Sequence, residues 1–151
     1  MKNRNQNHSD DWMTPPYFYN ELNAEFDFDF DPCPFQHDVT LWDGLLVDWG
    51  QRNFVNPPYS KDLKAAFVKK AIEESRKGKL CVMLLPVSTS TILFHDHILP
   101  NQKEIRFIRR RIKYIGINTF GKFVETIPSM HDDMVVIFDG RPPQPVKQII
   151  I

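Results

Sequence analysis

The stretch from Leu80 to Leu85 constrains the fold of this chain more than any other part of the sequence. It holds six apolar residues in a row and ends at Pro86. A strand with one solvent-exposed face alternates apolar and polar residues, whereas a strand buried on both faces of a parallel sheet is apolar throughout. The stretch therefore predicts a strand inside a sheet that is covered on both sides, as in an α/β fold.

The remaining periodic segments supply the other elements. Thr14 is a suitable N-cap and Pro15 a suitable first residue for a short helix, and Ser60 caps a longer helix that Gly78 ends. The expected helices cover residues 15–26, 60–77 and 92–99, and the expected strands cover residues 26–30, 53–55, 80–85, 104–115 and 134–138. A polar turn follows each of the first three strands. In a sheet of this kind, ligands bind at the carboxyl ends of the strands.

The length of 151 residues predicts one domain, which we place at residues 11–140, between a disordered arm over residues 1–10 and a tail over residues 141–151. Since the formal net charge is zero, any nucleic-acid binding must come from a local basic patch. Cys33 and Cys81 match no metal or redox spacing, and no apolar run has the length of a membrane span or a signal peptide. We therefore expect a soluble cytoplasmic protein without a metal ion.

The tetrapeptide Asn56-Pro57-Pro58-Tyr59 lies where an apolar strand ends and a capped helix begins. An exocyclic amino nitrogen is a poor nucleophile, because its lone pair is delocalised into the ring. The side-chain oxygen of Asn56 and the backbone carbonyl of Pro57 can bind the two amino hydrogens and free that lone pair. Consecutive prolines stiffen the turn, so these acceptors are in place before the substrate arrives. The ring of Tyr59 offers a flat face for an extruded base.

The other interpretation is a proline turn that merely ends a strand. Pro-Pro also occurs at residues 15–16 and 142–143, so the dipeptide alone decides nothing. The Asn before it, the aromatic residue after it and the strand-to-helix context favour a reactive turn.

Together with its flanking segments, this turn resembles the phage-type DNA N6-adenine methyltransferases, the Dam-like family, over residues 11–138. The tetrapeptide matches the (Asp/Asn)-Pro-Pro-(Tyr/Phe/Trp) motif of amino-methyltransferases. The other matching segments are Asp11-Trp12-Met13-Thr14-Pro15, Asp31-Pro32-Cys33-Pro34, Asp43-Gly44-Leu45 with Asp48-Trp49, Leu84-Leu85-Pro86, Phe94-His95-Asp96, Ile105-Arg106-Phe107-Ile108-Arg109 and Pro128-Ser129-Met130. The resemblance implies methyl transfer from S-adenosylmethionine to adenine N6 in DNA and, in a phage, protection of viral DNA from host restriction.

The resemblance also implies a reduced Rossmann-like class I methyltransferase fold, with a mostly parallel sheet, helices on both faces and an antiparallel C-terminal strand. The sheet is reduced because the interval before Asn56 is short, and the usual Gly-rich turn is replaced by residues 31–34. By position, Thr14 and Pro15 look like the segment at the methionine end of the cofactor. Asp31 and Pro32 look like the acidic turn beside it, and Asp43 looks like an acceptor for the cofactor's adenine amino group.

Candidate contacts to DNA phosphates are the basic residues near the fourth strand and one serine: Arg106, Arg109, Arg110, Arg111, Lys113 and Ser88. Binding of this kind weakens steeply with salt. The alternatives are a solvated edge strand with one charged face and, for Ser88, capping of the next helix.

Two further functions stay open. RNA and a protein glutamine amide also present a planar NH2 group, so the tetrapeptide does not separate them from DNA. A cofactor-free fold acting as a nucleic-acid-binding subunit is the non-enzymatic alternative. The sequence does not fix the oligomeric state, and a homodimer is one possibility.

Overall fold

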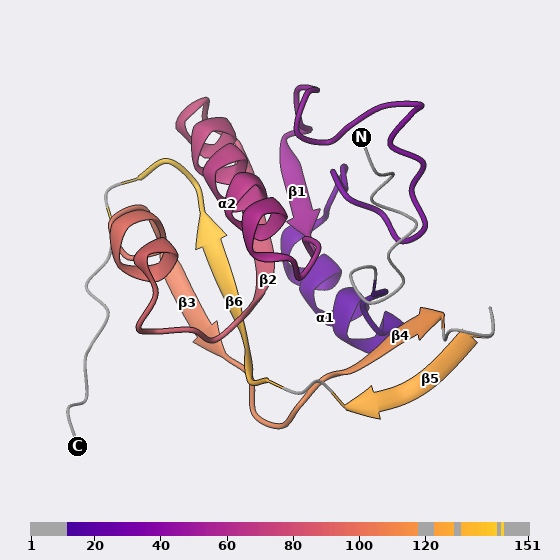
Figure 1. The fold of residues 1–151 in the computed structure, drawn as a ribbon. Coiled ribbons are helices and arrows are strands. Elements are labelled where there is room, and N and C mark those ends of the chain that lie inside the picture. Colours follow the sequence, from indigo (N-terminus) through magenta and orange to yellow (C-terminus); the bar gives the residue numbers. More distant parts are fainter. Residues whose placement is uncertain (1–11, 118–122, 129–130, 142, 144–151) are drawn as a thin grey trace, which may run out of the picture.

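A computed structural model of the chain describes residues 12–117, 123–128, 131–141 and 143. Its elements follow one another along the chain as shown in Figure 1: α1 (Pro16–Phe26), β1 (Arg52–Val55), α2 (Lys61–Arg76), β2 (Leu80–Pro86), the π-helix η2 (Leu93–Ile98), β3 (Glu104–Phe107), β4 (Lys113–Ile117), β5 (Phe123–Pro128) and β6 (Asp133–Phe138). The expected arm, most of the tail and the residues Ser129 and Met130 lie outside the described part.

The main sheet has four strands in the order β1-β2-β6-β3. β1 and β2 are parallel, whereas β6 is antiparallel to both β2 and β3. The expected antiparallel C-terminal strand is therefore confirmed. The expectation of a mostly parallel sheet is wrong for the pairs of neighbouring strands. Because β6 lies between β2 and β3, the sheet has one parallel pair and two antiparallel pairs.

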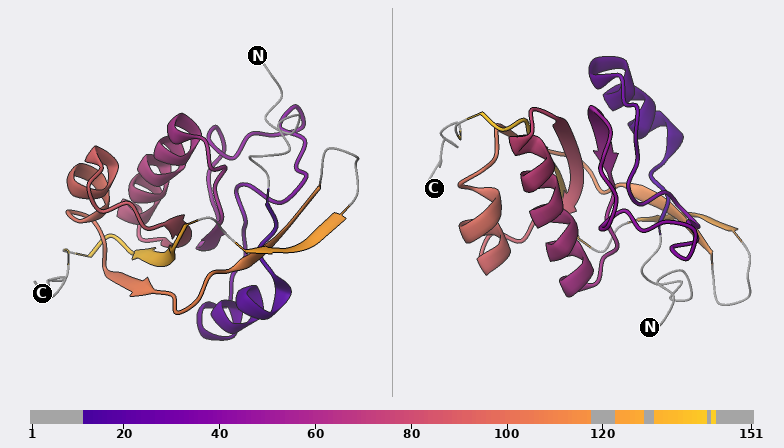
Figure 2. Two further views of the ribbon diagram at one scale, coloured as in Figure 1. Left: turned by 60° about the horizontal axis from the view of Figure 1, so that its bottom comes forward. Right: turned by 90° about the horizontal axis from the view of Figure 1, so that it is seen from above.

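β2 is the buried strand that the apolar run predicts. Cys81, Met83 and Leu85 face one core cluster, while Val82 and Leu84 face the other. Side chains of α2 and η2 pack into the first cluster, and side chains of α1 pack into the second. Helices consequently cover both faces of the sheet, as expected, and Figure 2 shows α1 on the side opposite α2.

α2 begins after Ser60, as expected, and ends near Gly78, whose φ of +88° is a left-handed conformation that suits glycine. The helix buries Glu74 completely. Lys70 and Lys79 hold its carboxylate at 3.1 and 2.6 Å and keep the pKa of this group at about 2 in spite of burial. The ion pairs thereby let a carboxylate lie against the core.

The strand expected over residues 104–115 is two strands that lie in different sheets. β3 joins β6, whereas β4 pairs with β5 in a separate two-stranded sheet. The break falls at Arg110, whose φ is +75°, a conformation that a continuous strand cannot contain.

The expected strand over residues 26–30 is also shorter than its alternation suggested. Phe26 ends α1, and Phe30 alone forms a parallel bridge, to Asn53 of β1. The helix itself starts one residue later than expected, with Pro15 in place of Thr14 at the N-cap. No helix among the described residues is long and apolar enough to cross a membrane.

Candidate active site

The turn over residues 56–59 leaves β1 directly after Val55, which is completely buried. The side-chain amide nitrogen of Asn56 donates to the backbone carbonyl of Trp12 at 2.9 Å and to Thr14 Oγ1 at 3.2 Å. A backbone carbonyl can only accept, so the NH2 end of this side chain must face Trp12. The Asn56 side-chain oxygen is therefore the end left to accept a hydrogen bond from a substrate.

A cavity of about 260 Å³ opens beside this amide. It brings together three of the residues assigned by sequence, Thr14, Asp31 and Asn56. Sequence reasoning missed the aromatic part of its lining, which consists of Trp12, Tyr19, Phe35 and Phe54. These residues lie in four separate segments of the sequence, and no local pattern shows that their rings line one cavity with Asp31.

Asp31 is the acidic group of this cavity. Burial raises the pKa of its carboxyl to about 7, and the hydrogen bond from the Cys33 N–H at 2.9 Å opposes that rise. The pKa of the Tyr19 hydroxyl is raised as well, by burial and by the nearby Asp31. A carboxyl with this pKa changes charge close to neutral pH, so a cation placed beside it displaces its proton.

The loop from residue 31 to residue 46 contacts the 56–59 turn and is packed tightly against itself. The Cys33 thiol donates to the backbone carbonyl of Asn56 at 2.9 Å. Gly44 lies so close to Pro32 that a Cβ atom on this glycine would be 1.9 Å from the Pro32 carbonyl oxygen. The position of residues 31–34 thus depends on a glycine that lies outside the cavity lining.

Three other residues assigned to the cofactor do not line the cavity. Asp43 uses its side chain locally, where it accepts from the Leu45 N–H at 2.9 Å. Pro15 and Pro32 are buried. In the described residues, the structure brings together Thr14 and Asp31 but not Pro15, Pro32 and Asp43.

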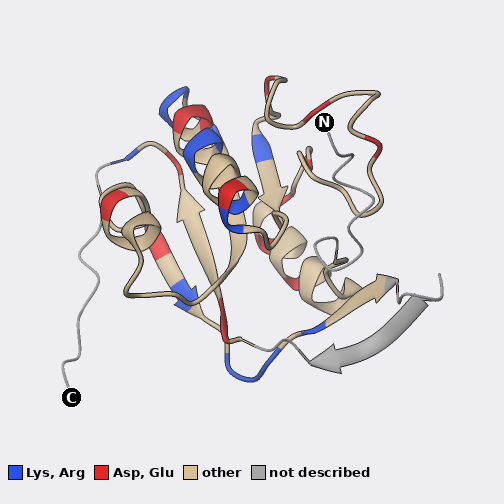
Figure 3. Cartoon of the chain, viewed as in Figure 1, with Lys and Arg blue, Asp and Glu red and all other residues tan. Residues whose placement is uncertain are grey.

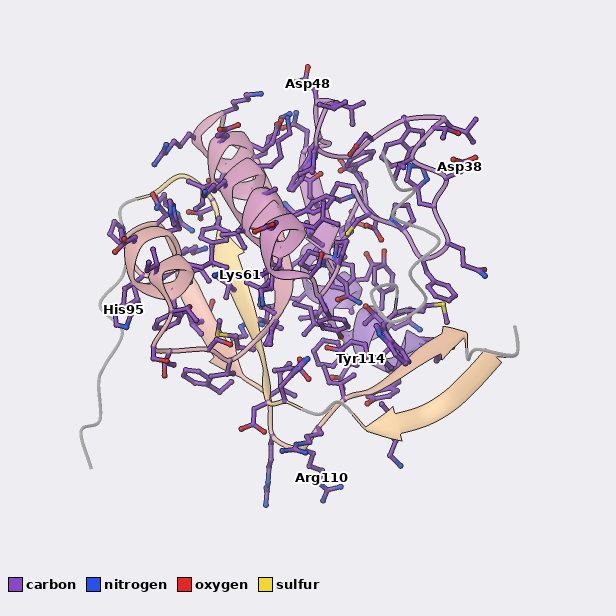
Figure 4. All side chains as sticks on the ribbon, in the orientation of Figure 1. Asp38, Asp48, Lys61, His95, Arg110 and Tyr114 are labelled. Atoms are coloured by element: carbon purple, nitrogen blue, oxygen red, sulfur yellow. The ribbon has the colours of Figure 1, made fainter. Side chains whose placement is uncertain are left out.

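Tyr59 ends the turn with a ring that is partly buried. Its centroid is 5.9 Å from the Tyr114 ring in an edge-on contact and 5.2 Å from the His131 ring. Tyr114 lies in the crowded interior near α1 (Figure 4). Tyr59 is therefore a fixed ring with two aromatic neighbours, and it does not project freely into solvent.

Comparison with models of protein families identifies the family of this chain. The family model described as DNA N-6-adenine-methyltransferase (Dam) matches residues 2–140. The chain belongs to this family. The resemblance seen in the sequence is thereby confirmed, and family membership indicates an adenine-specific DNA methyltransferase. No curated protein and no solved structure gives a significant match.

In this Dam-family chain the basic residues assigned to DNA differ in their surroundings. Arg106 is held by ion pairs to Glu25 at 2.5 Å and Glu104 at 2.7 Å, which raise the pKa of its guanidinium. Arg109 and Arg110 are exposed in the segment between β3 and β4, which is blue at the lower edge of Figure 3. Figure 4 shows Arg110 extending away from the molecule.

The two remaining basic residues of this set are also exposed. Arg111 lies 3.7 Å from Asp132, while Lys113 begins β4. Four of the five basic residues assigned to DNA in this Dam-family chain are therefore exposed between the end of β3 and the start of β4.

Ser88 belongs to a second and larger cavity of about 600 Å³ between α2 and η2. The same cavity is lined by Lys61, Lys64 and Lys69, and none of residues 56–59 contributes to it. Thr91 Oγ1, rather than the Ser88 side chain named above, accepts from the Phe94 N–H at 3.2 Å near the start of η2. Among the described residues of the Dam-family chain, no group of three or more metal-ligating side chains occurs.

Proposed function

We propose that this protein transfers the methyl group of S-adenosylmethionine to the exocyclic N6 amino group of adenine in DNA. The observation that carries the proposal is the fixed orientation of the Asn56 amide beside a cavity that contains an acidic group. Membership in the Dam family supplies the reaction class and the substrate.

Asn56 acts on the amino group of the target base. Since its nitrogen is held by Trp12 and Thr14, its oxygen accepts from the adenine amino group without prior rearrangement. Accepting that hydrogen draws the amino nitrogen out of conjugation and exposes its lone pair. A preorganised acceptor is effective because no reorganisation is needed when the reaction occurs. A second acceptor, the Pro57 carbonyl, follows directly in the stiff turn.

The residues around the 260 Å³ cavity fit the cofactor chemically. When bound, S-adenosylmethionine supplies a methyl group on a cationic sulfonium, already activated for transfer. The rings of Trp12 and Tyr19 suit a cation, because aromatic faces attract positive charge. Asp31 suits the ammonium group of the methionine end. The cavity is slightly smaller than the usual range of about 300–1,000 Å³ for small-molecule sites, so we assign it to that end of the cofactor.

The topology supports the same proposal. Ligands of open α/β sheets bind at the carboxyl ends of the strands, and the 56–59 turn lies at the carboxyl end of β1. Helices on both faces and the antiparallel β6 agree with a reduced class I methyltransferase arrangement. We assign the phosphate contacts to the exposed Arg109, Arg110, Arg111 and Lys113, because Arg106 is neutralised by two glutamates.

The test uses purified protein, radiolabelled S-adenosylmethionine and three separate acceptors: unmethylated duplex DNA, RNA and a protein extract. The labelled product is digested and the modified unit is identified. We expect N6-methyladenine from DNA, and we expect Asn56→Ala to abolish it. Asn101→Ala is the matched control, because that asparagine bonds to the His97 carbonyl far from the cavity.

Each other result rejects part of the proposal. Label in RNA alone or in a glutamine side chain rejects DNA as the substrate. Absence of labelling together with absence of cofactor binding rejects an enzymatic function and favours a nucleic-acid-binding subunit.

A further inference from the structure

Asp133 is a buried carboxyl that the proposed reaction does not use. It begins β6 opposite Pro86 of β2, and its side chain has no exposed surface. Side chains alternate along a strand, so Asp133 faces the same side of the sheet as Val135 and Ile137. Both of these residues belong to the core cluster into which α1 packs. An acidic group at this position costs free energy unless its neighbours compensate for the loss of water.

Those neighbours connect Asp133 to the reactive turn. His131 Nδ1 lies 3.2 Å from Asp133 Oδ1. The pKa of the Asp133 carboxyl is raised by burial and by the negative Asp132, while His131 and the Tyr114 hydroxyl lower it. The pKa of Tyr114 is also raised, by burial and by its proximity to Tyr59 and Asp133, so Tyr114 keeps its proton and remains a donor.

The same two neighbours of Asp133 hold the Tyr59 ring. Tyr114 contacts it edge-on at 5.9 Å, and His131 lies against it at 5.2 Å. Among the described residues, no hydrogen bond of ideal geometry reaches either Asp133 carboxyl oxygen. The Asp133 carboxyl is thus surrounded by the close His131 ring and by the Tyr114 hydroxyl, which interacts with it electrostatically.

We propose that Asp133 is a positioning residue, which acts through Tyr114 and His131 to fix the Tyr59 ring against which the target base stacks. This inference rests on the proposed function, because it assigns a role in binding the base. A ring that is already oriented contributes more to binding, because a mobile ring loses conformational entropy when the base stacks on it. Ionised Asp133 attracts the Tyr114 hydroxyl and the His131 ring more strongly than protonated Asp133 does.

The pH dependence follows from the groups around this carboxyl. They are His131 and Asp132 on the segment before β6, Tyr114 on β4 and Tyr59 on the turn, and Arg111 lies 3.7 Å from Asp132. On the acid side, kcat/KM for DNA should rise as Asp133 loses its proton. Saturating cofactor must be present, so that the titration of Asp31 does not contribute.

The experiment compares the wild-type protein with Asp133→Asn, Tyr114→Phe and the control Asp139→Asn. Asp139 directly follows the other end of β6 and pairs with Lys103 at 3.3 Å, so the control makes the same chemical change next to the same strand. We expect kcat/KM for DNA to fall roughly tenfold in Asp133→Asn and Tyr114→Phe, the size of one lost hydrogen bond. The dissociation constant of S-adenosylmethionine should change less than about twofold, because neither residue lines that cavity.

The acid limb of the pH profile should be present in the wild-type protein and in Asp139→Asn and absent in Asp133→Asn. Wild-type kinetics and pH profiles in both network variants would overturn the inference while leaving the proposed function intact. Equal losses of cofactor binding and DNA activity would also overturn it, because they indicate a general folding role. A wild-type protein without methyltransferase activity would reject the proposed function itself, and the inference with it.

Discussion

The side-chain amide of Asn56 donates to the backbone carbonyl of Trp12 at 2.9 Å, across 44 positions of sequence. This bond ties the segment before α1 to the 56–59 turn. It also fixes the direction of the amide, and Thr14 reinforces that direction from the same segment.

Thr14→Val should lower the rate of methyl transfer without unfolding the protein. The substitution removes the hydroxyl that accepts from Asn56 at 3.2 Å and keeps the shape of the side chain, while the bond to Trp12 remains. We expect kcat to fall up to about tenfold, since one hydrogen bond contributes about 1 kcal/mol. Thr40→Val is the control, because that exposed hydroxyl bonds to Asp38. Equal activity of the two variants in single-turnover assays would show that Thr14 does not orient the amide.

The affinity for S-adenosylmethionine should increase as the pH rises through about 7, the pKa of Asp31. The ionised carboxylate attracts the cationic cofactor, whereas below this pKa the group is neutral and binding must first release its proton. Titration calorimetry between about pH 5.5 and 8.5 measures the effect. In Asp31→Asn the affinity should be lower and this dependence should vanish, while Asp38→Asn should behave as the wild type. A dependence that persists in Asp31→Asn would assign it to another group.

The same carboxyl should make the free protein less stable as the pH rises. The pKa of Asp31 is higher in the folded state than in the unfolded state, so its stabilising contribution is complete below the ordinary aspartate range of about 3.9. That contribution is lost as the pH rises through about 7. Over this window the thermal midpoint of Asp31→Asn should fall less than that of the wild type. Parallel pH curves for the two proteins would contradict the assigned pKa.

Gly44→Ala should weaken cofactor binding, although Gly44 is not part of the cavity lining. The added Cβ would be 1.9 Å from the Pro32 carbonyl oxygen, so the turn that carries Asp31 has to move. The matched control is Gly78→Ala, where the new methyl group has no neighbour within 4 Å. The control is strained by its φ of +88° and should lose about 1 kcal/mol of stability without losing cofactor affinity. Unchanged affinity in Gly44→Ala would show that Asp31 does not depend on this contact.

Substituting both Arg109 and Arg110 by Ala should weaken DNA binding and make it less sensitive to salt. Each lost phosphate contact reduces the slope of log affinity against log salt by roughly 0.9. Fluorescence anisotropy with a labelled duplex at several salt concentrations gives this slope. Arg76→Ala, at the end of α2, is the control because it is exposed but bonds to Asn101. An unchanged slope in the double variant would place the DNA elsewhere on the surface.

Local pattern determined several parts of this protein. The apolar run of β2 predicted a strand buried on both sides, and five of its six residues are buried. The helical spacing and caps placed α2 within a residue at each end, because caps and periodicity act over a few neighbouring residues. The chemistry of its residues singled out the tetrapeptide at 56–59 as the candidate reactive turn, and the Dam family model covers these residues.

Tertiary structure alone decided the remainder, because the deciding partners are distant in sequence. The insertion of β6 between β2 and β3 follows from pairing that no single strand encodes. The alternation of apolar and basic residues over 104–115 continues through Arg110, but the two halves of this segment belong to different sheets. The surroundings of Asp31 and Asp133 depend on burial by elements from across the chain. Burial therefore gives these two carboxyls raised pKa values, which residue type and spacing do not reveal.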